Sequence, residues 1–219
     1  MTAVIDYGMG NLGSILNILK KIGHTAKLAK KGEDIAGADR LILPGVGAFD
    51  DAMKALKRLG YVDALEDKVV HGKTPILGIC LGMQLFTRKS EEAKEEKGFG
   101  WFDADTVRFR FPQEARLKVP HMGWNYVNLH ERTFAPQDQE ERMRFYFVHS
   151  YHVVCHEKGA VMGTTSYGYD FASVIAKDSI VGVQFHPEKS HRYGMQFMRW
   201  FLEWDGYWDS REVRVTSDV

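Results

Sequence analysis

The first half of the chain alternates very short apolar runs with helical patterns, and this alternation constrains the fold more than any other feature. Apolar runs stand at residues 3–5, 41–43 and 76–79. Between them, apolar residues recur at helical spacing, first over residues 15–22. Continuous apolar strands that alternate with amphipathic helices are typical of a parallel sheet with helices on both faces. We therefore predict an α/β fold with a mixed, mostly parallel sheet flanked by helices.

Strand-like stretches with little helix between them follow in the second half. They cover residues 106–109, 126–129, 145–148, 152–155, 171–175 and 181–185. We expect several of them to form antiparallel additions beside the parallel core. A last amphipathic helix is expected from about His191 to Glu203, and the charge run Glu91–Lys97 is interpreted as a solvated surface segment.

Length and charge narrow the class of protein. No linker rich in proline, glycine or serine divides the 219 residues, so we expect a single domain over residues 1–204 and a polar, disordered tail over residues 205–219. The 29 basic and 29 acidic residues balance, so we expect neither nucleic acid nor a membrane as a partner. Two cysteines are too few for a disulfide framework, and without a leader peptide or a long apolar stretch we expect a cytoplasmic protein.

The segment Gly78-Ile79-Cys80-Leu81-Gly82 joins a predicted strand to a predicted helix and has the form of a nucleophile elbow. A sharp turn at this place lifts the cysteine off the sheet edge, and glycine on either side avoids the clash of a Cβ atom. The N-terminus of the following helix favours a thiolate and offers N–H groups to an oxyanion. The alternative is a small buried cysteine in a glycine-rich strand end.

A general base is available in the segment Val183-Gln184-Phe185-His186-Pro187-Glu188, which resembles the end of another strand. Pro187 disfavours a helical conformation at His186, so we expect the pair to stay extended. Residues two apart on an extended chain face the same side, which places Glu188 beside His186. His186 can then move protons while Glu188 orients its ring. Without Cys80, a structural histidine beside a surface glutamate would be the simpler interpretation.

The segment Gly8-Met9-Gly10-Asn11-Leu12-Gly13 matches the G-x-G-x-x-G pattern of dinucleotide-binding turns. Such a site needs an acidic residue about 20 positions later. The sequence there is Lys27-Leu28-Ala29-Lys30-Lys31-Gly32-Glu33, with bases first and the acid late. We therefore prefer a tight strand-to-helix turn at a partner surface over a non-catalytic nucleotide-binding module. The nine histidines show no metal-ligand spacing, and we predict no metal and no cofactor.

The elbow with Met83 and Gln84, together with the segment Val183–Ser190, resembles class I (triad) glutamine amidotransferases. Residues 5–11, 43–49, 120–125 and 146–151 are similar to the HisH family, the glutaminase subunits of imidazole glycerol phosphate synthase. The resemblance runs from Val4 to about Leu202. It implies the flavodoxin-like fold of the class I glutamine amidotransferases.

The resemblance implies a role for each matching residue. Cys80 would attack the side-chain amide of L-glutamine, His186 would protonate the departing ammonia and then activate water, and Glu188 would orient the imidazole ring. The oxyanion hole would be formed by Gly45, Val46, Gly47 and Leu81. The substrate glutamine would be bound by Gln84, Ser150 and Tyr151.

A partner is implied as well. Members of this family form a heterodimer with a (β/α)8-barrel cyclase subunit, which receives the ammonia and makes imidazole glycerol phosphate and AICAR in histidine biosynthesis. The residues that would lie at or near this interface are Asn11, Trp124, Tyr146 and Lys189. Because a glutaminase without an acceptor wastes glutamine, we expect the isolated chain to have low activity.

Two other enzymatic functions stay open. Trp101 stands where histidine-pathway members more often carry an aliphatic residue, and the chain extends past the usual end of the fold. Both features resemble paralogous glutaminases that supply ammonia to a sugar amidotransferase of surface-polysaccharide biosynthesis. A stand-alone γ-glutamyl cysteine hydrolase is the third possibility, but it leaves the interface-like segments Gly8–Asn11 and His121–Asn125 unexplained.

Overall fold

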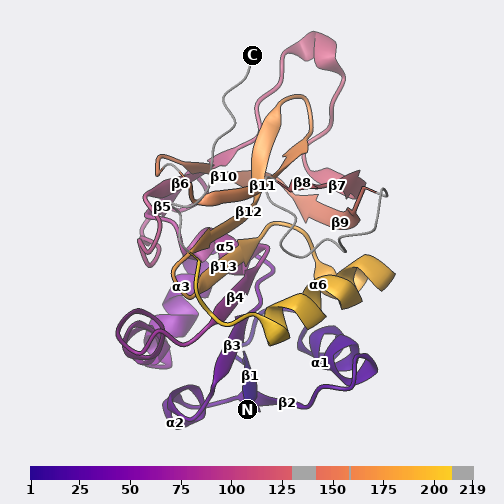
Figure 1. Cartoon of the computed structure of the whole chain (residues 1–219). Coiled ribbons are helices and arrows are strands. Elements are labelled where there is room, and N and C mark those ends of the chain that lie inside the picture. Colours follow the sequence, from indigo (N-terminus) through magenta and orange to yellow (C-terminus); the bar gives the residue numbers. More distant parts are fainter. Residues whose placement is uncertain (130–141, 158, 209–219) are drawn as a thin grey trace.

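The computed structural model describes residues 1–129, 142–157 and 159–208 (Figure 1). The helices are α1 (Leu12–Lys21), α2 (Gly32–Ala36), α3 (Phe49–Arg58), α4 (Tyr61–Leu65), the π-helix η1 (Glu66–His71), α5 (Leu81–Leu85), the 3-10 turns η2 (Gln113–Ala115) and η3 (Pro187–Lys189), and α6 (His191–Glu203). The strands are β1 (Thr2–Ile5), β2 (Ala26–Ala29), β3 (Arg40–Leu43), β4 (Ile76–Ile79), β5 (Lys89–Ser90), β6 (Ala104–Arg108), β7 (His121–Tyr126), β8 (Asn128–Leu129), β9 (Arg144–His149), β10 (Tyr151–Cys155), β11 (Val161–Ser166), β12 (Asp170–Lys177) and β13 (Ile180–Val183). Within these ranges no helix is long and apolar enough to cross a membrane.

The main sheet has a parallel core with the strand order β2-β1-β3-β4-β13. Beyond β13, the strands β12, β10 and β6 each pair antiparallel with the strand before them, and β5 lies at the edge. The predicted α/β class, with a largely parallel sheet and antiparallel additions in the second half, is confirmed. One strand from the second half, β13, belongs to the parallel core instead, because it runs parallel to β4.

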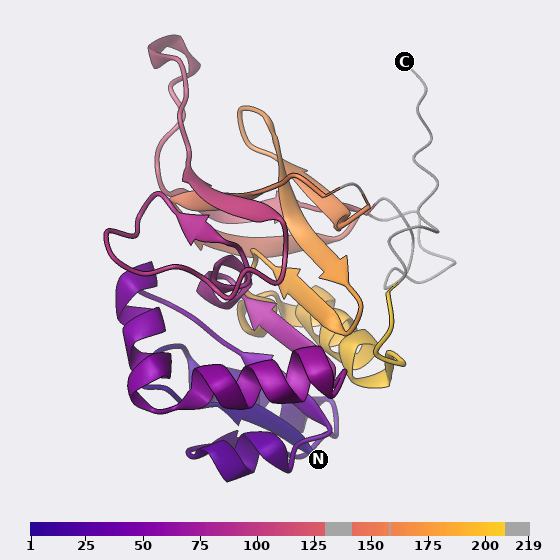
Figure 2. The same ribbon diagram turned by 90° about the vertical axis from the view of Figure 1, so that its left-hand side faces the viewer.

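Helices cover both faces of the parallel core (Figures 1 and 2). α1 and α6 pack against each other on one face, and α2 and α3 each pack against α4 on the other. Side chains alternate between the faces along each strand: Val4 lies in the apolar cluster that holds Phe197 of α6, whereas Ile5 lies in the cluster that holds Phe49 of α3. All four side chains are fully buried. The continuous apolar strands of the sequence are therefore explained by burial on both faces.

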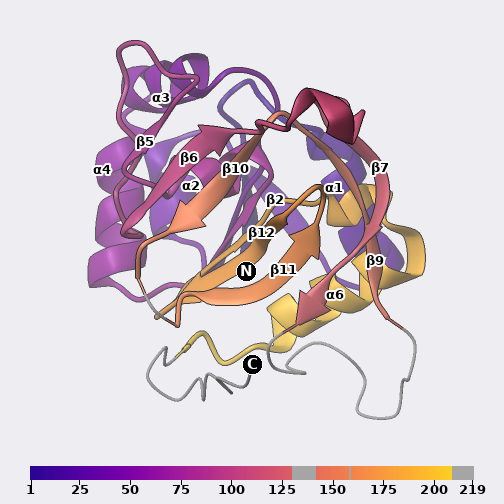
Figure 3. The ribbon, with the colours of Figure 1, turned by 90° about the horizontal axis from the view of Figure 1, so that it is seen from above.

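β7 and β9 form a separate two-stranded antiparallel sheet, in which His121 pairs with His149 and Trp124 with Tyr146. Viewed from above, this sheet lies on the side of the molecule where α6 runs (Figure 3). One face of β7 carries Met122, Trp124 and Tyr126, whose exposed fractions are 62%, 42% and 44%. Apolar side chains are thus exposed in a row along one face of this sheet.

The residues after α6 fold back onto the molecule. The backbone of Trp208 exchanges two hydrogen bonds with Asp178, of 2.8 and 3.1 Å, and its side chain is buried. Of the tail that we place at residues 205–219, the first part is therefore packed, and residues 209–219 lie outside the described residues. A single domain over residues 1–204 remains our proposal.

Candidate active site

Cys80 follows β4 directly and is the N-cap residue of α5, with a positive φ of 55° and ψ −108°. Its N–H donates to the carbonyl of Val183 on β13 at 2.8 Å, which ties the turn to the neighbouring strand. A Cβ atom at Gly78 would overlap the ring of Phe86, and one at Gly82 would overlap the carbonyl oxygen of Leu43. Packing thus requires glycine on both sides of Cys80, and the strained turn at Cys80 presents the thiol above the carboxyl ends of the parallel strands.

His186 lies just beyond β13, the strand next to β4, and Nδ1 of its ring is 2.8 Å from Oε1 of Glu188. Both side chains are only 2% exposed. His186 is extended as expected, with φ −103°, but Glu188 does not continue the strand. Pro187 begins the 3-10 turn η3, a position that suits proline because its ring fixes φ and its missing N–H would be unpaired there. The predicted pair forms, but through a turn rather than through strand alternation.

The charges around His186 favour its protonated form. Burial lowers its pKa, but the negative charge and hydrogen bonding of Cys80, and then the hydrogen bond and charge of Glu188, outweigh burial and raise the pKa to about 10. Within the described part of the chain, Nε2 is buried and has no hydrogen-bond partner of ordinary geometry. With Nδ1 held by Glu188, Nε2 is the nitrogen left to exchange a proton with Cys80 or with a bound substrate.

Two buried glutamines connect Cys80 to the wall of the site. Nε2 of Gln184 donates to Sγ of Cys80 at 3.6 Å. Nε2 of Gln84 donates both to Oε1 of Gln184 at 3.0 Å and to the carbonyl of Tyr151 at 3.1 Å. Our sequence analysis did not single out Gln184, although it stands two residues before His186 in the segment that directly follows β13, and that spacing could have found it.

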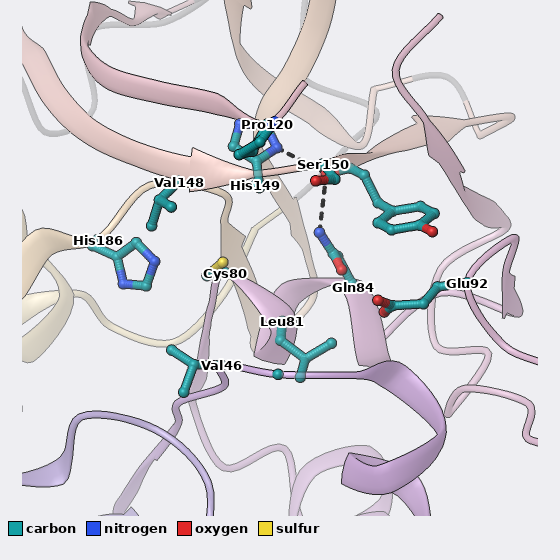
Figure 4. A pocket seen from close by; sticks show the side chains of 12 residues that line it. Val46, Cys80, Leu81, Gln84, Glu92, Pro120, Val148, His149, Ser150 and His186 are labelled. Atoms are coloured by element: carbon teal, nitrogen blue, oxygen red, sulfur yellow. Dashed lines mark hydrogen bonds between the residues drawn. The ribbon is translucent and has the colours of Figure 1, made fainter. Parts of the chain in front are cut away.

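A cavity of about 350 Å³ opens beside the thiol (Figure 4). The predicted residues that line it come from distant parts of the sequence: Val46, Gly47, Cys80, Leu81, Gln84, Ser150, Tyr151 and His186. Figure 4 shows His186 on one side of Cys80, and Gln84 and Ser150 on the other. The expected nucleophile, base and substrate-binding side chains thus border one cavity of the size that holds a small molecule.

Glu92 also lines this cavity, so the charge run, which is a surface segment as expected, contributes one carboxylate to the site. Oε2 of Glu92 accepts a hydrogen bond of 3.0 Å from the N–H of Phe49, at the start of α3. Asp50 in turn accepts from the N–H groups of Lys94 and Glu96, which lower its pKa. The run is held against the N-terminus of α3, and a helix N-terminus attracts carboxylates in this way. The contact could not be predicted from the sequence, because a cluster of charged residues is typical of a solvated surface.

The loop that carries Gly45 and Gly47 lies against the start of α5. A Cβ atom at Gly45 would stand 2.6 Å from Cβ of Leu81, so only glycine allows this approach, and Gly47 has φ +107°. The hydroxyl of the buried Tyr7 donates to the carbonyl of Pro44 at 2.7 Å. Burial first, and the charge of Cys80 second, raise the pKa of Tyr7, so that it stays a hydrogen-bond donor. Tyr7 is a supporting residue that our sequence analysis missed.

Three of the four expected interface residues lie together. The rings of Trp124 and Tyr146 are 6.3 Å apart, and Nζ of Lys189 lies 5.8 Å from the centre of the Tyr146 ring. His191 stacks on Trp124 at 5.5 Å. The fourth, Asn11, is placed differently: its side chain caps α1 by accepting from the N–H of Ser14 at 3.3 Å, and α1 contacts η3.

The glycine motif that resembles a dinucleotide turn has a packing role. A Cβ atom at Gly10 would stand 2.9 Å from Cβ of Pro44, and Gly10 has φ +105°. The motif therefore forms a tight turn against the loop before Gly45. Among the described residues no group of three or more histidine, cysteine, aspartate or glutamate side chains is placed to hold a metal ion.

Comparisons with known proteins agree on one family. The family model described as "Glutamine amidotransferase class-I" matches residues 3–203. A protein of Methanococcus maripaludis named "Imidazole glycerol phosphate synthase subunit HisH 2" is 51% identical, over 93% of this chain and 99% of its own length. The protein of the same name from Pseudomonas aeruginosa is 46% identical over the same shares. "Imidazole glycerol phosphate synthase subunit HisH 1" of Campylobacter jejuni is 42% identical, over 92% of this chain and 99% of its own.

Solved structures show the same fold. A structure described as "Crystal structure of glutamine amidotransferase" superposes with a TM-score of 0.71 at 19% identity, over 92% of this chain and 97% of that one. "Structure of PurLQS from Thermotoga maritima" superposes with a TM-score of 0.68 at 16% identity, over 92% and 97%.

Proposed function

The chain belongs to the class-I glutamine amidotransferase family, and from that premise we propose how its residues hydrolyse glutamine. It is an enzyme, a glutaminase subunit of the HisH type, which acts in histidine biosynthesis. The observation that carries the residue assignment is the imidazole of His186, hydrogen-bonded to Glu188 at 2.8 Å and bordering the same cavity as Cys80.

The reaction proceeds in two halves. The Cys80 thiolate attacks the side-chain amide carbon of L-glutamine, and His186 donates its proton to the departing nitrogen, so that ammonia leaves and a γ-glutamyl thioester remains. His186, now neutral, takes a proton from water, which attacks the thioester. Glutamate then leaves. Because His186 keeps the proton taken from water and Cys80 leaves as a thiolate, the thiolate–imidazolium pair is restored. Glu188 holds the ring through Nδ1 in both halves.

The oxyanion formed in the reaction and the two charged ends of glutamine each need a group that binds them. The N–H of Leu81, at the start of α5, and the loop of Gly45, Val46 and Gly47 supply donors for the oxyanion. We place the α-carboxylate of glutamine at Ser150 and Tyr151. The α-ammonium is placed at Gln84 and Glu92, because a carboxylate in the cavity is an acceptor that an ammonium group requires.

The name shared by the relatives designates a subunit, so a partner subunit is part of the function. We propose that this partner is a (β/α)8-barrel cyclase and that it docks on the face of Trp124, Tyr146 and Lys189 with the exposed row on β7. The exposed row of apolar side chains supports a docking surface, and the ammonium group of Lys189 over the Tyr146 ring adds a positive charge to it. We further propose the cytoplasm as the compartment, since Cys80 and Cys155 are free thiols.

A second candidate keeps the same chemistry with another acceptor. In this candidate the ammonia goes to a sugar amidotransferase of surface-polysaccharide biosynthesis. Trp101 does not support it, because this side chain is explained by packing: it stacks on Phe99 at 4.3 Å, and its Nε1 donates to Glu66 at 2.7 Å.

The test is glutamate release from glutamine by the purified chain, alone and then with the barrel subunit and its nucleotide ligand. We expect negligible release alone and a large rise in the complex, and no release in either case for Cys80→Ala. A chain that stays idle with that barrel would favour the sugar-modifying acceptor. Rapid release without any partner would indicate the stand-alone hydrolase.

A further inference from the structure

Two buried histidines that take no part in the triad form a series of hydrogen bonds that begins in the wall of the glutamine site, where His149 lines the cavity, and leads away from it to His121. Nδ1 of His149 lies 2.8 Å from the carbonyl of Tyr151, and Nε2 of His149 lies 3.0 Å from Nδ1 of His121. Nε2 of His121 lies 3.2 Å from Nδ2 of Asn125. The two histidine side chains are only 6% and 3% exposed. The two imidazole rings therefore depend on their protein neighbours rather than on water for hydrogen bonds.

The chemistry of the hydrogen-bonding groups fixes which atom donates and which accepts in each bond of this series. A carbonyl only accepts, so His149 must donate from Nδ1 to Tyr151 and, when neutral, can only accept at Nε2. His121 must then donate from Nδ1, and its Nε2 accepts from the amide of Asn125. Burial lowers the pKa of His149 to about 3 and of His121 to about 4, which keeps both rings neutral as this order requires.

The carbonyl of Tyr151 is the point where this hydrogen-bond series meets the substrate pocket. It accepts from His149 on one side and from Nε2 of Gln84 on the other (Figure 4). The second Nε2 proton of Gln84 is donated to Oε1 of Gln184. Both donors of the Gln84 amide are thus used by the protein, and its Oε1, on the side of Glu92 in Figure 4, is the face offered to the cavity.

We propose that His149 and His121 are positioning residues for glutamine binding: they hold the Tyr151 carbonyl, which fixes the Gln84 amide with its oxygen toward the α-ammonium of the substrate. This inference rests on the proposed glutaminase function. If the carbonyl is not held, the Gln84 amide can rotate and present N–H groups to a cation, which weakens binding. The effect therefore falls on glutamine binding rather than on the chemistry at Cys80.

The far end of this hydrogen-bond series lies on the proposed docking strand. Asn125 stands on β7 between the exposed Trp124 and Tyr126, and its Nδ2 also donates to the carbonyl of Ser166 at 3.0 Å. A partner that contacts Trp124 and Tyr126 would therefore affect the position of Asn125, which is the first donor of this hydrogen-bond series. The glutamine site is thus connected to the docking face by four hydrogen bonds, from Asn125 through His121, His149 and Tyr151 to Gln84.

The test compares His149→Phe, His149→Asn and His152→Phe in the assembled synthase. Asparagine keeps a donor near the place of Nδ1, whereas phenylalanine removes it. His152 is the control for the loss of a histidine from the aromatic cluster: its ring lies 4.6 Å from that of Phe109, but it hydrogen-bonds to Tyr169 and lies outside the hydrogen-bond series. His149 lines the cavity and His152 does not, so His149→Asn controls for the change in the cavity wall. KM for glutamine, kcat for glutamate release and melting temperature are measured for each.

We expect His149→Phe to raise KM for glutamine about tenfold with kcat changed less than about threefold, as for the loss of one buried hydrogen bond. His149→Asn should restore most of the KM, and His152→Phe should leave it near that of the unmodified protein. An equal rise in KM for the two phenylalanine variants, or a loss confined to kcat, would overturn the proposal.

Folding and function are separated by two further readouts. If His149→Phe does not fold, His121→Leu serves in its place, since it frees the tautomer of His149 without touching the cavity. It should raise KM about threefold or more, and an unchanged KM would refute the role of the hydrogen-bond series. Failure of the proposed function would instead appear as absence of glutamate release by the unmodified complex.

Discussion

Replacing Glu188 by glutamine removes a charge from the triad while it keeps the size of the side chain and an acceptor for Nδ1 of His186. Oε1 of Glu188 lies 2.8 Å from that nitrogen, and both side chains are 2% exposed, so solvent does not screen the pair. A buried hydrogen bond to a charged group contributes about 1.5–3 kcal/mol. If that contribution is realised mainly in the transition state, kcat should fall about 10- to 150-fold.

The same substitution should change the pH profile. The pKa of His186 stands at about 10, and Cys80 and Glu188 both raise it. Protonation of the departing ammonia needs the imidazolium, so activity is lost as the pH rises through the pKa of His186. Without the Glu188 charge this pKa falls, and the alkaline limb of the kcat profile should move to lower pH. Glutamate release in the complex, measured from pH 6 upward, checks both effects.

Two variants make the experiment decisive. His186→Ala removes the base itself and should lower kcat about a thousandfold or more. Glu92→Gln alters another carboxylate of the cavity and should raise KM without moving the alkaline limb. Equal losses for Glu188→Gln and His186→Ala, or an alkaline limb that stays in place, would refute the orienting role of Glu188.

Three further outcomes are expected. Cys80→Ala should abolish glutamate release with an unchanged melting temperature; activity that persists would mean that another residue is the nucleophile. Gly82→Ala should lower the free energy of unfolding by about 2–4 kcal/mol, because its Cβ would overlap the carbonyl of Leu43, and a melting temperature equal to that of the unmodified protein would contradict this. His121 and His149 have folded pKa values near 4 and 3, below the ordinary 6.5, so the unfolded chain binds protons first as the pH falls below 6.5. The melting temperature should therefore fall from pH 6.5 toward 4, less steeply in His149→Asn, and identical slopes would refute this assignment.

Local patterns in the sequence were sufficient for the parts of the site that are local in the chain. The apolar run before Gly78 and the glycines around Cys80 predict a strand and a sharp turn because each property acts on adjacent residues. His186 and Glu188 form one unit for the same reason, even though the turn at Pro187 replaces the expected strand. The alternation of strands and helices likewise predicts the α/β class, since periodicity reports which faces are buried.

The tertiary structure alone decided which distant segments meet. Nothing within residues 91–97 shows that Glu92 reaches the cavity, because its partner is the N–H of Phe49 at the start of another helix. The same holds for Gln84 and Gln184, which meet at 3.0 Å across 100 residues of sequence. Their contact exists because β13 pairs parallel with β4 inside the sheet, and the apolar pattern of β13 is equally compatible with an edge or antiparallel position. Strand order depends on packing summed over the whole chain, and a pattern that acts over a few residues carries no information about it.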